Sequence, residues 1–262
     1  MRERVLITGA SKGIGAATAR LLAEKDYQVI GTALPGENLD DAPEGVTFLR
    51  LNLNDDHSIE TCLAEAGEID ILINCAGVSQ VGPLEEYPIE KMRALFQTNV
   101  FGAVQMTQAL LPRMRRMGKG FIINIGSLAG KFAVPFQTGY VASKYAVAGW
   151  SWALRSEVKK FGVRVVVIEP NDIRTTITPE LNLHPGSDYC DDVECMKKAR
   201  AESMKKACGP EGVARKVLSI LRSKKPRPFY TVGGAGPFMV FLKRFVPDTL
   251  LEKLIRRNYG LK

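Results

Sequence analysis

The chain has 262 residues, of which 45% are hydrophobic and 24% are charged. This composition is that of a soluble globular protein, and the length suffices for one sizeable core. No apolar run approaches the roughly 20 residues that a membrane-spanning helix needs. The first residues also lack the charged, apolar and small-residue order of a signal peptide. We therefore expect a cytoplasmic protein without a membrane span.

The net charge of +8 arises from 36 basic and 28 acidic residues that are scattered along the chain. Nucleic-acid binding would need basic residues interleaved with aromatic ones on one element, so we expect instead a phosphorylated cofactor or an acidic substrate. The five cysteines form no CxxC pair, and there are only two histidines. These counts argue against a disulfide framework, a metal site and chemistry built on histidine.

Short β-rich runs alternate with longer helical patterns along the chain. The expected strands, apolar on both faces, are Val5–Thr8, Tyr27–Ala33, Val46–Leu51, Ile69–Asn74, Gly120–Ile125, Val163–Glu169 and Phe229–Val232. The expected helices are Ile14–Glu24, Ser58–Glu65, Pro88–Met117, Gly139–Lys160 and Glu211–Leu221. This alternation predicts one α/β domain, a Rossmann-type doubly wound parallel sheet of about seven strands with helices on both faces. Its ligand should lie at the carboxyl ends of the strands.

Two segments do not follow the alternation. Residues 175–208 are polar and contain two prolines, which predicts a loop with short helices. Residues 236–262 are rich in apolar side chains interrupted by a proline, and we expect a helical tail there. Within a single domain of residues 1–262 we thus expect a cofactor-binding and catalytic core (1–175), a substrate lid (176–208) and this tail (236–262).

The segment from Thr8 to Gly15 has the pattern T-G-x-x-x-G-x-G, between the first expected strand and the first expected helix. Glycines at such a junction permit a tight turn and a close approach of the backbone to a ligand, and the helix N-terminus offers N–H groups to a phosphate. The pattern also fits a tight turn with no ligand. Its place after the first strand favours a site for the pyrophosphate of a dinucleotide.

Tyr140 and Lys144 stand four residues apart on an expected helix, so both side chains lie on one face. Hydride transfer to a carbonyl needs a proton donor at the developing alkoxide, and the reverse reaction needs a base. A tyrosine can serve only if the pKa of its phenol, about 10 in general, falls, and a nearby cation has this effect. Such pairs are common on helix surfaces, so the pair alone does not identify an active site.

With its glycine pattern and the segment Gly139–Tyr145 (G-Y-V-A-S-K-Y), the chain resembles the short-chain dehydrogenase/reductase family, and within it the hydroxysteroid and retinol dehydrogenases. The motifs that carry the resemblance run from about Val5 to Thr175. The resemblance implies that a serine orients the substrate oxygen, a tyrosine is the acid or base, and an asparagine helps to hold a water that links the lysine to solvent. The implied catalytic residues are Asn99, Ser127, Tyr140 and Lys144.

Other roles are conceivable for two of these residues. Ser127 could belong to a nucleophile elbow, G-x-S-x-G, but Ile125 and Ala129 occupy the two glycine positions and neither histidine is suitably placed. A serine hydrolase is therefore disfavoured. Asn99 could also be an ordinary mid-helix residue with a local backbone bond.

The resemblance further implies a nicotinamide cofactor, held by the glycine loop and by the ends of the following strands. The implied residues are Gly9, Ser11, Lys12, Gly13, Ile14, Gly15, Leu34, Asn52, Leu53, Asn74, Ala76, Gly77, Tyr140, Lys144, Pro170, Ile173 and Thr175. Two positions depart from the family's pattern. Cys75 replaces the second asparagine of N-N-A-G, and we expect a buried neutral thiol there. Asn171 replaces a glycine, and we expect the turn to survive because asparagine tolerates positive φ.

The identity of the nicotinamide cofactor depends on the end of the second expected strand. NAD-binding relatives carry an acid there for the ribose hydroxyls, whereas this chain has Ala33 and Leu34, and no acid replaces it. Lys12 in the glycine loop is suitably placed for a 2′-phosphate. The arginine that many NADP-using relatives carry after this strand is absent. We expect NADP(H) to be preferred, with NAD(H) possible.

Apolar side chains of the lid and of the segment before Tyr140 indicate a lipophilic alcohol or ketone, of hydroxysteroid or retinoid type. They are Leu128, Val134, Pro135, Phe136, Ile177, Leu181, Leu183, Tyr189 and Met196. Two other functions stay open. One is a 3-oxoacyl thioester reductase that docks an acidic acyl carrier. The other is a non-catalytic NADP-sensing binding protein, against which the intact serine, tyrosine and lysine argue.

The tail has two possible roles. It either caps the substrate site or lies on an anionic membrane surface as a peripheral contact. The basic residues that would face the headgroups are Lys243, Arg244, Lys253, Arg256 and Arg257. Relatives pair through the helix that carries Tyr140, which implies a homodimer or homotetramer.

Overall fold

A parallel sheet forms the centre of the computed structural model, which describes residues 2–174 and 179–261. Its strands are β1 (Arg4–Ile7), β2 (Gln28–Ala33), β3 (Thr47–Arg50), β4 (Ile71–Asn74), β6 (Gly120–Ile125), β7 (Val163–Pro170) and β9 (Phe229–Val232). They lie in the order β3-β2-β1-β4-β6-β7-β9, so the direction of winding reverses between β1 and β4. This arrangement confirms the expected doubly wound Rossmann-type sheet, and a ligand site belongs at the reversal.

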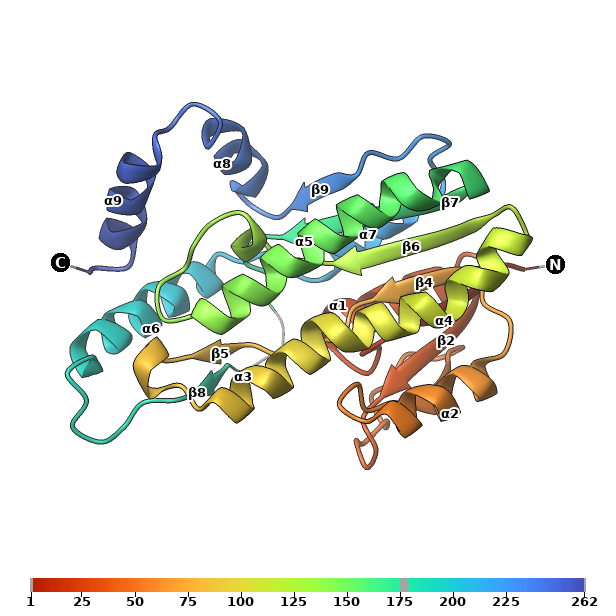
Figure 1. Cartoon of the computed structure of the whole chain (residues 1–262), viewed down its shortest axis with the longest axis horizontal. Helices are drawn as coiled ribbons and strands as arrows, with labels where there is room; N and C mark the ends of the chain where they lie inside the picture. Colours follow the sequence, from red (N-terminus) through yellow and green to blue (C-terminus); the bar gives the residue numbers. More distant parts are fainter. Residues whose placement is uncertain (1, 175–178, 262) are drawn as a thin grey trace.

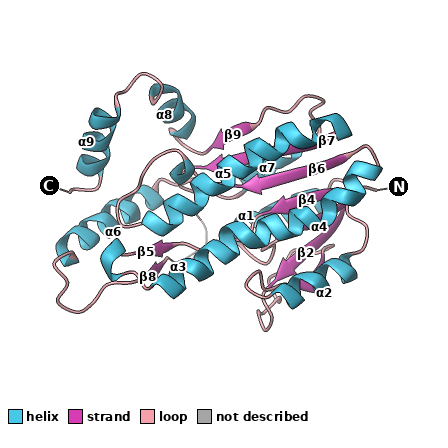
Figure 2. Cartoon of the chain, viewed as in Figure 1, coloured by secondary structure: helices cyan, strands magenta, loops and turns pink. Residues whose placement is uncertain are grey.

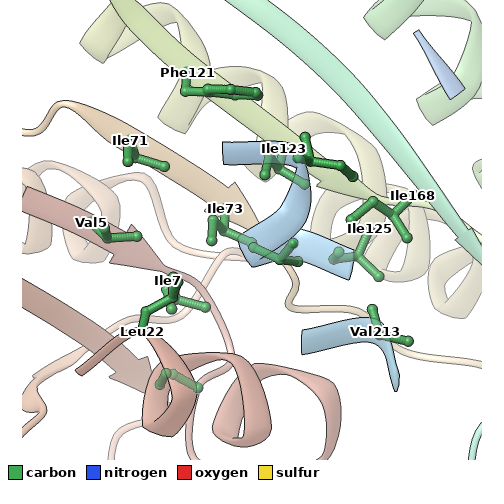
Figure 3. Packing of buried hydrophobic residues seen from close by; sticks show 14 of the residues in the cluster. Val5, Ile7, Leu22, Ile71, Ile73, Phe121, Ile123, Ile125, Ile168 and Val213 are labelled. Carbon is green, nitrogen blue, oxygen red and sulfur yellow. The ribbon is translucent and has the colours of Figure 1, made fainter. Parts of the chain in front are cut away.

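Helices cover both faces of the sheet (Figures 1 and 2). On one face lie α1 (Gly13–Ala23) and α7 (Glu211–Leu221), which contribute to the same hydrophobic cluster. On the other lie α2 (Asp56–Ala66), α4 (Gly102–Arg116) and α5 (Thr138–Val158). The strands separate the two clusters because their side chains alternate. Val5 and Ile7 of β1 point to the first cluster (Figure 3), and Leu6 points to the second.

The segment expected as one helix over Pro88–Met117 is continuous but not regular. It consists of α3 (Ile89–Phe96), a π-helical turn (Gln97–Phe101) and α4. A π turn inserts one residue into the helical repeat and so rotates the side chains that follow it. The inserted turn contains Asn99, one of the expected catalytic residues. Short 3-10 turns occur at Leu84–Glu86, Leu128–Gly130 and Lys159–Phe161.

The expectation of a loop with short helices over residues 175–208 was wrong. Its second half is the 16-residue helix α6 (Cys190–Lys205), with Asp191 and Asp192 in the first turn and Lys205 in the last. Acids near the N-terminus and a base near the C-terminus stabilise a helix through its dipole. This charge order could have indicated the helix in a segment whose polar composition suggested a loop. Earlier in the segment, β8 (Glu180–Leu181) pairs in parallel with β5 (Gln80–Val81), and these two strands form a small separate sheet.

The C-terminal tail consists of α8 (Gly236–Leu242) and α9 (Asp248–Asn258). Figure 1 shows both helices beyond the arrowhead of β9, at the same end of the molecule as α6. Lys243 donates a hydrogen bond to the main-chain oxygen of Lys131, and its Nζ lies 5.3 Å from the centre of the Phe132 ring. Tyr259 packs against a small cluster that includes Met196 of α6. No helix in residues 2–174 and 179–261 is long and apolar enough to cross a membrane.

Candidate active site

A cavity of about 900 Å³ opens at the carboxyl ends of the strands. Its walls include residues that lie one or two positions past the ends of five strands, namely Gly9, Leu34, Ala76, Ser127 and Asn171. The volume lies near the top of the ~300–1,000 Å³ range of ligand pockets. The cavity therefore has the position and size for a dinucleotide-binding site of a doubly wound sheet.

Tyr140 and Lys144 lie on the first turns of α5 and both line the cavity. The Nζ atom of Lys144 donates a hydrogen bond to the main-chain oxygen of Ile125 at 3.1 Å and lies 5.6 Å from the centre of the Tyr140 ring. Only 6% of Lys144 is exposed. A charge held in so buried a position acts on its neighbours with little screening by water.

Ser127 lies in the wall of the same cavity, just past the end of β6. Its Oγ accepts a hydrogen bond of 3.1 Å from the main-chain N–H of Ala129, so Ser127 caps the short 3-10 turn (Leu128–Gly130) that follows. This bond fixes the side chain through an acceptor site of the hydroxyl and leaves the O–H to donate. The structure thus brings together Ser127, Tyr140 and Lys144, as the sequence predicts.

Asn99 is buried behind this wall, where it holds a neighbouring segment. Its Oδ1 accepts from the N–H of Val78 at 2.8 Å, and its Nδ2 donates to the Val78 oxygen at 2.9 Å and to Ser143 Oγ at 3.1 Å. Both amide hydrogens are thereby used. A Cβ atom on Gly77 would lie 3.2 Å from Asn99 Oδ1 and 3.6 Å from Lys144 Nζ. Glycine at position 77 therefore lets the asparagine and the lysine approach the same stretch of backbone.

The glycine loop forms a cradle at the N-terminus of α1. Gly9 has a φ of +66°, and a Cβ there would lie 2.9 Å from the Cα of Ala76. Gly13 has a φ of +57°, and a Cβ on Gly15 would overlap the main-chain oxygen of Gly9. No side chain caps α1 and no acid lies in its first turn. The N–H groups and the positive end of the helix dipole are thus available to a phosphate, so these residues fit a pyrophosphate.

Most of the other expected cofactor residues border the cavity. Those that do are Gly9, Ser11, Lys12, Gly13, Ile14, Gly15, Leu34, Asn52, Leu53, Ala76, Gly77, Pro170 and Ile173. Asn74 does not. Its Nδ2 donates instead to Asn124 Oδ1 at 2.8 Å and to Thr107 Oγ1 at 3.2 Å, which ties β4 to β6 and α4. Thr175 lies outside the described residues.

Glu37 is a carboxylate of this site that the sequence analysis missed. Its Oε1 lies 3.0 Å from Lys12 Nζ and accepts a 3.0 Å bond from Ser11 Oγ, and its Oε2 accepts from the Leu34 N–H at 3.1 Å. Partial burial raises the pKa of Glu37, but the bonds from Lys12, Leu34 and Ser11 outweigh this and hold it below its usual range. The expectation that no acid replaces the one missing at the strand end was therefore wrong. A turn after Leu34 brings Glu37 back to the glycine loop.

The two departures from the family's pattern differ in their effect. Burial raises the pKa of the Cys75 thiol to about 12, although the Lys144 ammonium acts in the opposite direction. Cys75 is thus a neutral thiol, but it borders the cavity and is only partly buried, whereas a buried thiol was expected. Asn171 does not use a positive φ. Among the described residues other than glycine, a positive φ occurs at Asp26 and Phe136.

The apolar wall of the cavity differs from the one expected. Leu128 and Val134 line it, but Leu183, Tyr189 and Met196 of the lid pack with Phe136 in a separate cluster. Leu181 is half exposed, and Ile177 lies outside the described residues. The tail supplies most of the apolar wall instead, beside Ala199 and Met204 of α6. Its lining residues are Met239, Leu242, Val246, Leu251, Leu254, Ile255 and Tyr259.

The described residues hold no cluster of three or more His, Cys, Asp or Glu side chains that could bind a metal ion. A phenol, a serine hydroxyl and a buried ammonium beside a phosphate cradle can bind a carbonyl oxygen and supply it with a proton.

Comparisons with known proteins agree with this geometry. A family model described as short chain dehydrogenase matches residues 3–186. The 3-ketodihydrosphingosine reductase of Bacteroides thetaiotaomicron is 34% identical, over 98% of each chain. Human retinol dehydrogenase 8 is 32% identical, over 85% of this chain and 78% of its own. A serine dehydrogenase solved in complex with NADP+ has a TM-score of 0.74 at 28% identity, covering 88% of this chain and 95% of its own.

Proposed function

Since this chain belongs to the short-chain dehydrogenase/reductase family, whose members are oxidoreductases of alcohol and carbonyl groups with a nicotinamide cofactor, we propose that it interconverts a lipophilic ketone and its alcohol with NADP(H). The observation that carries this proposal is the meeting of three groups in one cavity. Ser127, Tyr140 and Lys144 lie there beside the glycine cradle.

Each residue of the site has a separate role in the proposed reduction. The bound nicotinamide cofactor supplies the hydride. Ser127 donates a hydrogen bond to the substrate oxygen and so orients the carbonyl. Tyr140 gives its phenolic proton to the same oxygen as negative charge develops, and in oxidation the phenolate takes that proton back. Lys144 stabilises the phenolate by its charge, because it is buried and fixed to Ile125. Asn99 is a positioning residue that fixes the backbone beside the lysine.

NADP(H) is the proposed cofactor because Lys12 lies in the glycine loop and residues Ala33 and Leu34 carry no charge. The NADP+ complex of the structural neighbour supports the same choice. Glu37 opposes it, because its carboxylate already holds Lys12. A 2′-phosphate must displace Glu37 from the lysine before it can bind there. A comparison of kcat/KM for NADPH and NADH tests the proposal, and a preference for NADH would refute it.

The proposed substrate is long and lipophilic. Aliphatic side chains of the tail and of the segment before Tyr140 line the cavity. The two curated relatives are named for 3-ketodihydrosphingosine and retinol, which both combine an apolar chain with one reacting oxygen function. The hydroxysteroid or retinoid class remains within this proposal, with sphingoid ketones added. Nothing at the cavity specifically favours a 3-oxoacyl thioester or a purely sensory role.

A substrate screen that follows NADPH absorbance tests the proposal. Its panel contains a long-chain 3-keto base, retinal, a 3-ketosteroid, short aliphatic ketones and an acyl thioester. We expect the highest kcat/KM for a long-chain member. A highest value for the acyl thioester would support the alternative reductase, and binding of NADPH without turnover of any member would support the sensor.

We also propose that the protein is a cytoplasmic homodimer or homotetramer. Trp152 on the outer side of α5 is 62% exposed, and its ring meets that of Phe229 edge-on at 5.5 Å. A large aromatic side chain left in solvent on the helix that carries Tyr140 is suited to an interface between copies. Light scattering of the purified protein measures the mass directly, and a monomer at micromolar concentration would contradict this proposal.

A further inference from the structure

The tail presents aromatic side chains to solvent on the face that points away from the cavity. Phe238, Phe241 and Phe245 stand at positions i, i+3 and i+7 and are 62%, 54% and 70% exposed. Met239 and Leu242, each one position further along, line the cavity. The three phenylalanines therefore form an outer stripe on α8 and on the turn after it. The rings of Phe241 and Phe245 lie 5.4 Å apart and continue the stripe past the helix end.

Helix α9 has the same division. Leu251 and Ile255 are partly buried and line the cavity, four residues apart. Leu250 and Leu254 are 47% and 50% exposed, and Leu254 also borders the cavity. The tail thus has two apolar faces. The inner face closes the cavity, and no described residue covers the outer face. Outer apolar surface of this extent marks a site of interaction.

The outer face is also basic. Lys243 is engaged with Lys131 and Phe132, so it is not available, contrary to the expectation from the sequence. The remaining basic residues of the tail are exposed, and only two acids accompany them in residues 236–261. The bases are Arg244, Lys253, Arg256 and Arg257, and the acids are Asp248 and Glu252. Exposed phenylalanine and leucine interspersed with arginine and lysine are the composition of helices that lie in the headgroup region of a bilayer.

We infer that the outer face of α8 and α9 docks on an anionic lipid bilayer. The contact residues, called the tail surface below, are Phe238, Phe241, Phe245, Leu250, Leu254, Arg244, Lys253 and Arg257. The charges decide between a bilayer and a second copy of the chain. Two copies meeting through this face would bring positive charge against positive charge, whereas anionic headgroups are complementary to it.

The docked orientation gives the cavity access to the bilayer. Met239, Leu242 and Leu254 line the cavity and are also 40%, 39% and 50% exposed. These three residues thus belong both to the outer surface of the tail and to the cavity that Tyr140 lines. We infer that a lipophilic ketone enters the cavity from the bilayer beside them. This second step rests on the proposed function, whereas the docking itself does not.

The experiment is flotation of the full-length protein with vesicles of phosphatidylcholine alone and with equal parts of phosphatidylcholine and phosphatidylglycerol. Two variants test the tail surface. One removes the aromatic stripe (Phe241→Ser with Phe245→Ser), and the other removes three charges (Arg244→Gln, Lys253→Gln and Arg257→Gln). The matched control removes three charges just before the amino ends of β6, β7 and β9, at the opposite edge of the sheet (Arg116→Gln, Lys159→Gln and Lys224→Gln).

We expect the intact protein and the control to float with the anionic vesicles, and each tail variant to bind them roughly tenfold more weakly or less. Added salt should release the intact protein. Failure of the intact protein to float, or equal flotation of the tail variants, would overturn the inference. So would a change of oligomeric mass in the tail variants without any flotation of the intact protein, since a second copy would then be the occupant. Flotation involves no turnover, so a failed substrate screen would refute the proposed function and leave the docking result unaffected.

Discussion

Lys144 on α5 donates a hydrogen bond of 3.1 Å to the main-chain oxygen of Ile125, the last residue of β6. Ser127 follows Ile125 by two residues, and Tyr140 precedes Lys144 by one helical turn. This bond, together with the one from Asn124 of β6 to Ser151 of α5, holds the helix that carries the tyrosine against the strand that precedes the serine. The lysine thus has two functions in the proposed mechanism, since it aligns the two hydroxyl groups and supplies the charge beside the phenol.

Replacement of this lysine should change the pH dependence of the reaction. In Lys144→Met we expect kcat for alcohol oxidation at neutral pH to fall about 10²-fold or more, because no cation favours the phenolate. A free phenol loses its proton near pH ~10, so activity should partly recover as the pH rises toward that value. The measurement is a kcat–pH profile, with Lys159→Met beyond the other end of α5 as control. A profile of unchanged shape would argue that the lysine has only a structural role.

Glu37 should determine how well NADPH competes with NADH. In Glu37→Gln we expect KM for NADPH to fall several-fold and KM for NADH to change less, because Lys12 is freed for a 2′-phosphate. The hydrogen bonds that lower the pKa of Glu37 keep it ionised at neutral pH, so the wild-type competition operates under ordinary assay conditions. Lys12→Ala should have the opposite effect and weaken NADPH more than NADH. Steady-state kinetics with both cofactors checks both variants, and equal effects on the two cofactors would remove these residues from the phosphate subsite.

The cysteines should react with a thiol reagent in two classes. Burial raises the pKa of Cys75 to about 12 and that of Cys62 to about 11, so both remain protonated and unreactive at pH 8. Cys190, Cys195 and Cys208 are exposed and should react with Ellman's reagent in the native protein. Cys75→Ser should leave the fast-reacting thiols unchanged in number, whereas Cys190→Ser should remove one. Loss of a fast-reacting thiol in Cys75→Ser would show that the cysteine is accessible and ionised.

The strand-end motifs could be predicted from the sequence because each is local. The glycines from Thr8 to Gly15 follow a strand and begin a helix, and the four-residue separation of Tyr140 and Lys144 fixes their common face. Alternation of strands and helices then places Ser127 at the same edge of the sheet. Their functional roles, in contrast, rested on the resemblance to the family, because the tyrosine–lysine pair alone does not identify an active site.

The features that were missed depend on contacts between distant segments. Glu37 reaches Lys12 only because the turn after Leu34 reverses the chain. Lys243 and Tyr259 attach the tail to segments that lie more than 60 residues earlier, and this attachment makes the tail part of the cavity wall. The apolar residues expected for the lid gave the opposite error, because Leu183, Tyr189 and Met196 pack on one another, and the lid borders the cavity through Ala199 and Met204 of α6 instead. Amino-acid composition cannot distinguish apolar residues that line a cavity from apolar residues that pack on one another.

The most direct test of the proposed mechanism is the turnover of Tyr140→Phe, with Tyr145→Phe on the same helix as the matched control. Loss of one phenolic oxygen should lower kcat/KM for the best ketone of the screen by about 10²–10⁴-fold. NADPH affinity, measured by the fluorescence of the bound cofactor, should be nearly unchanged, and the control should retain full activity. Full turnover in Tyr140→Phe would contradict the assignment of Tyr140 as the acid and base of this enzyme.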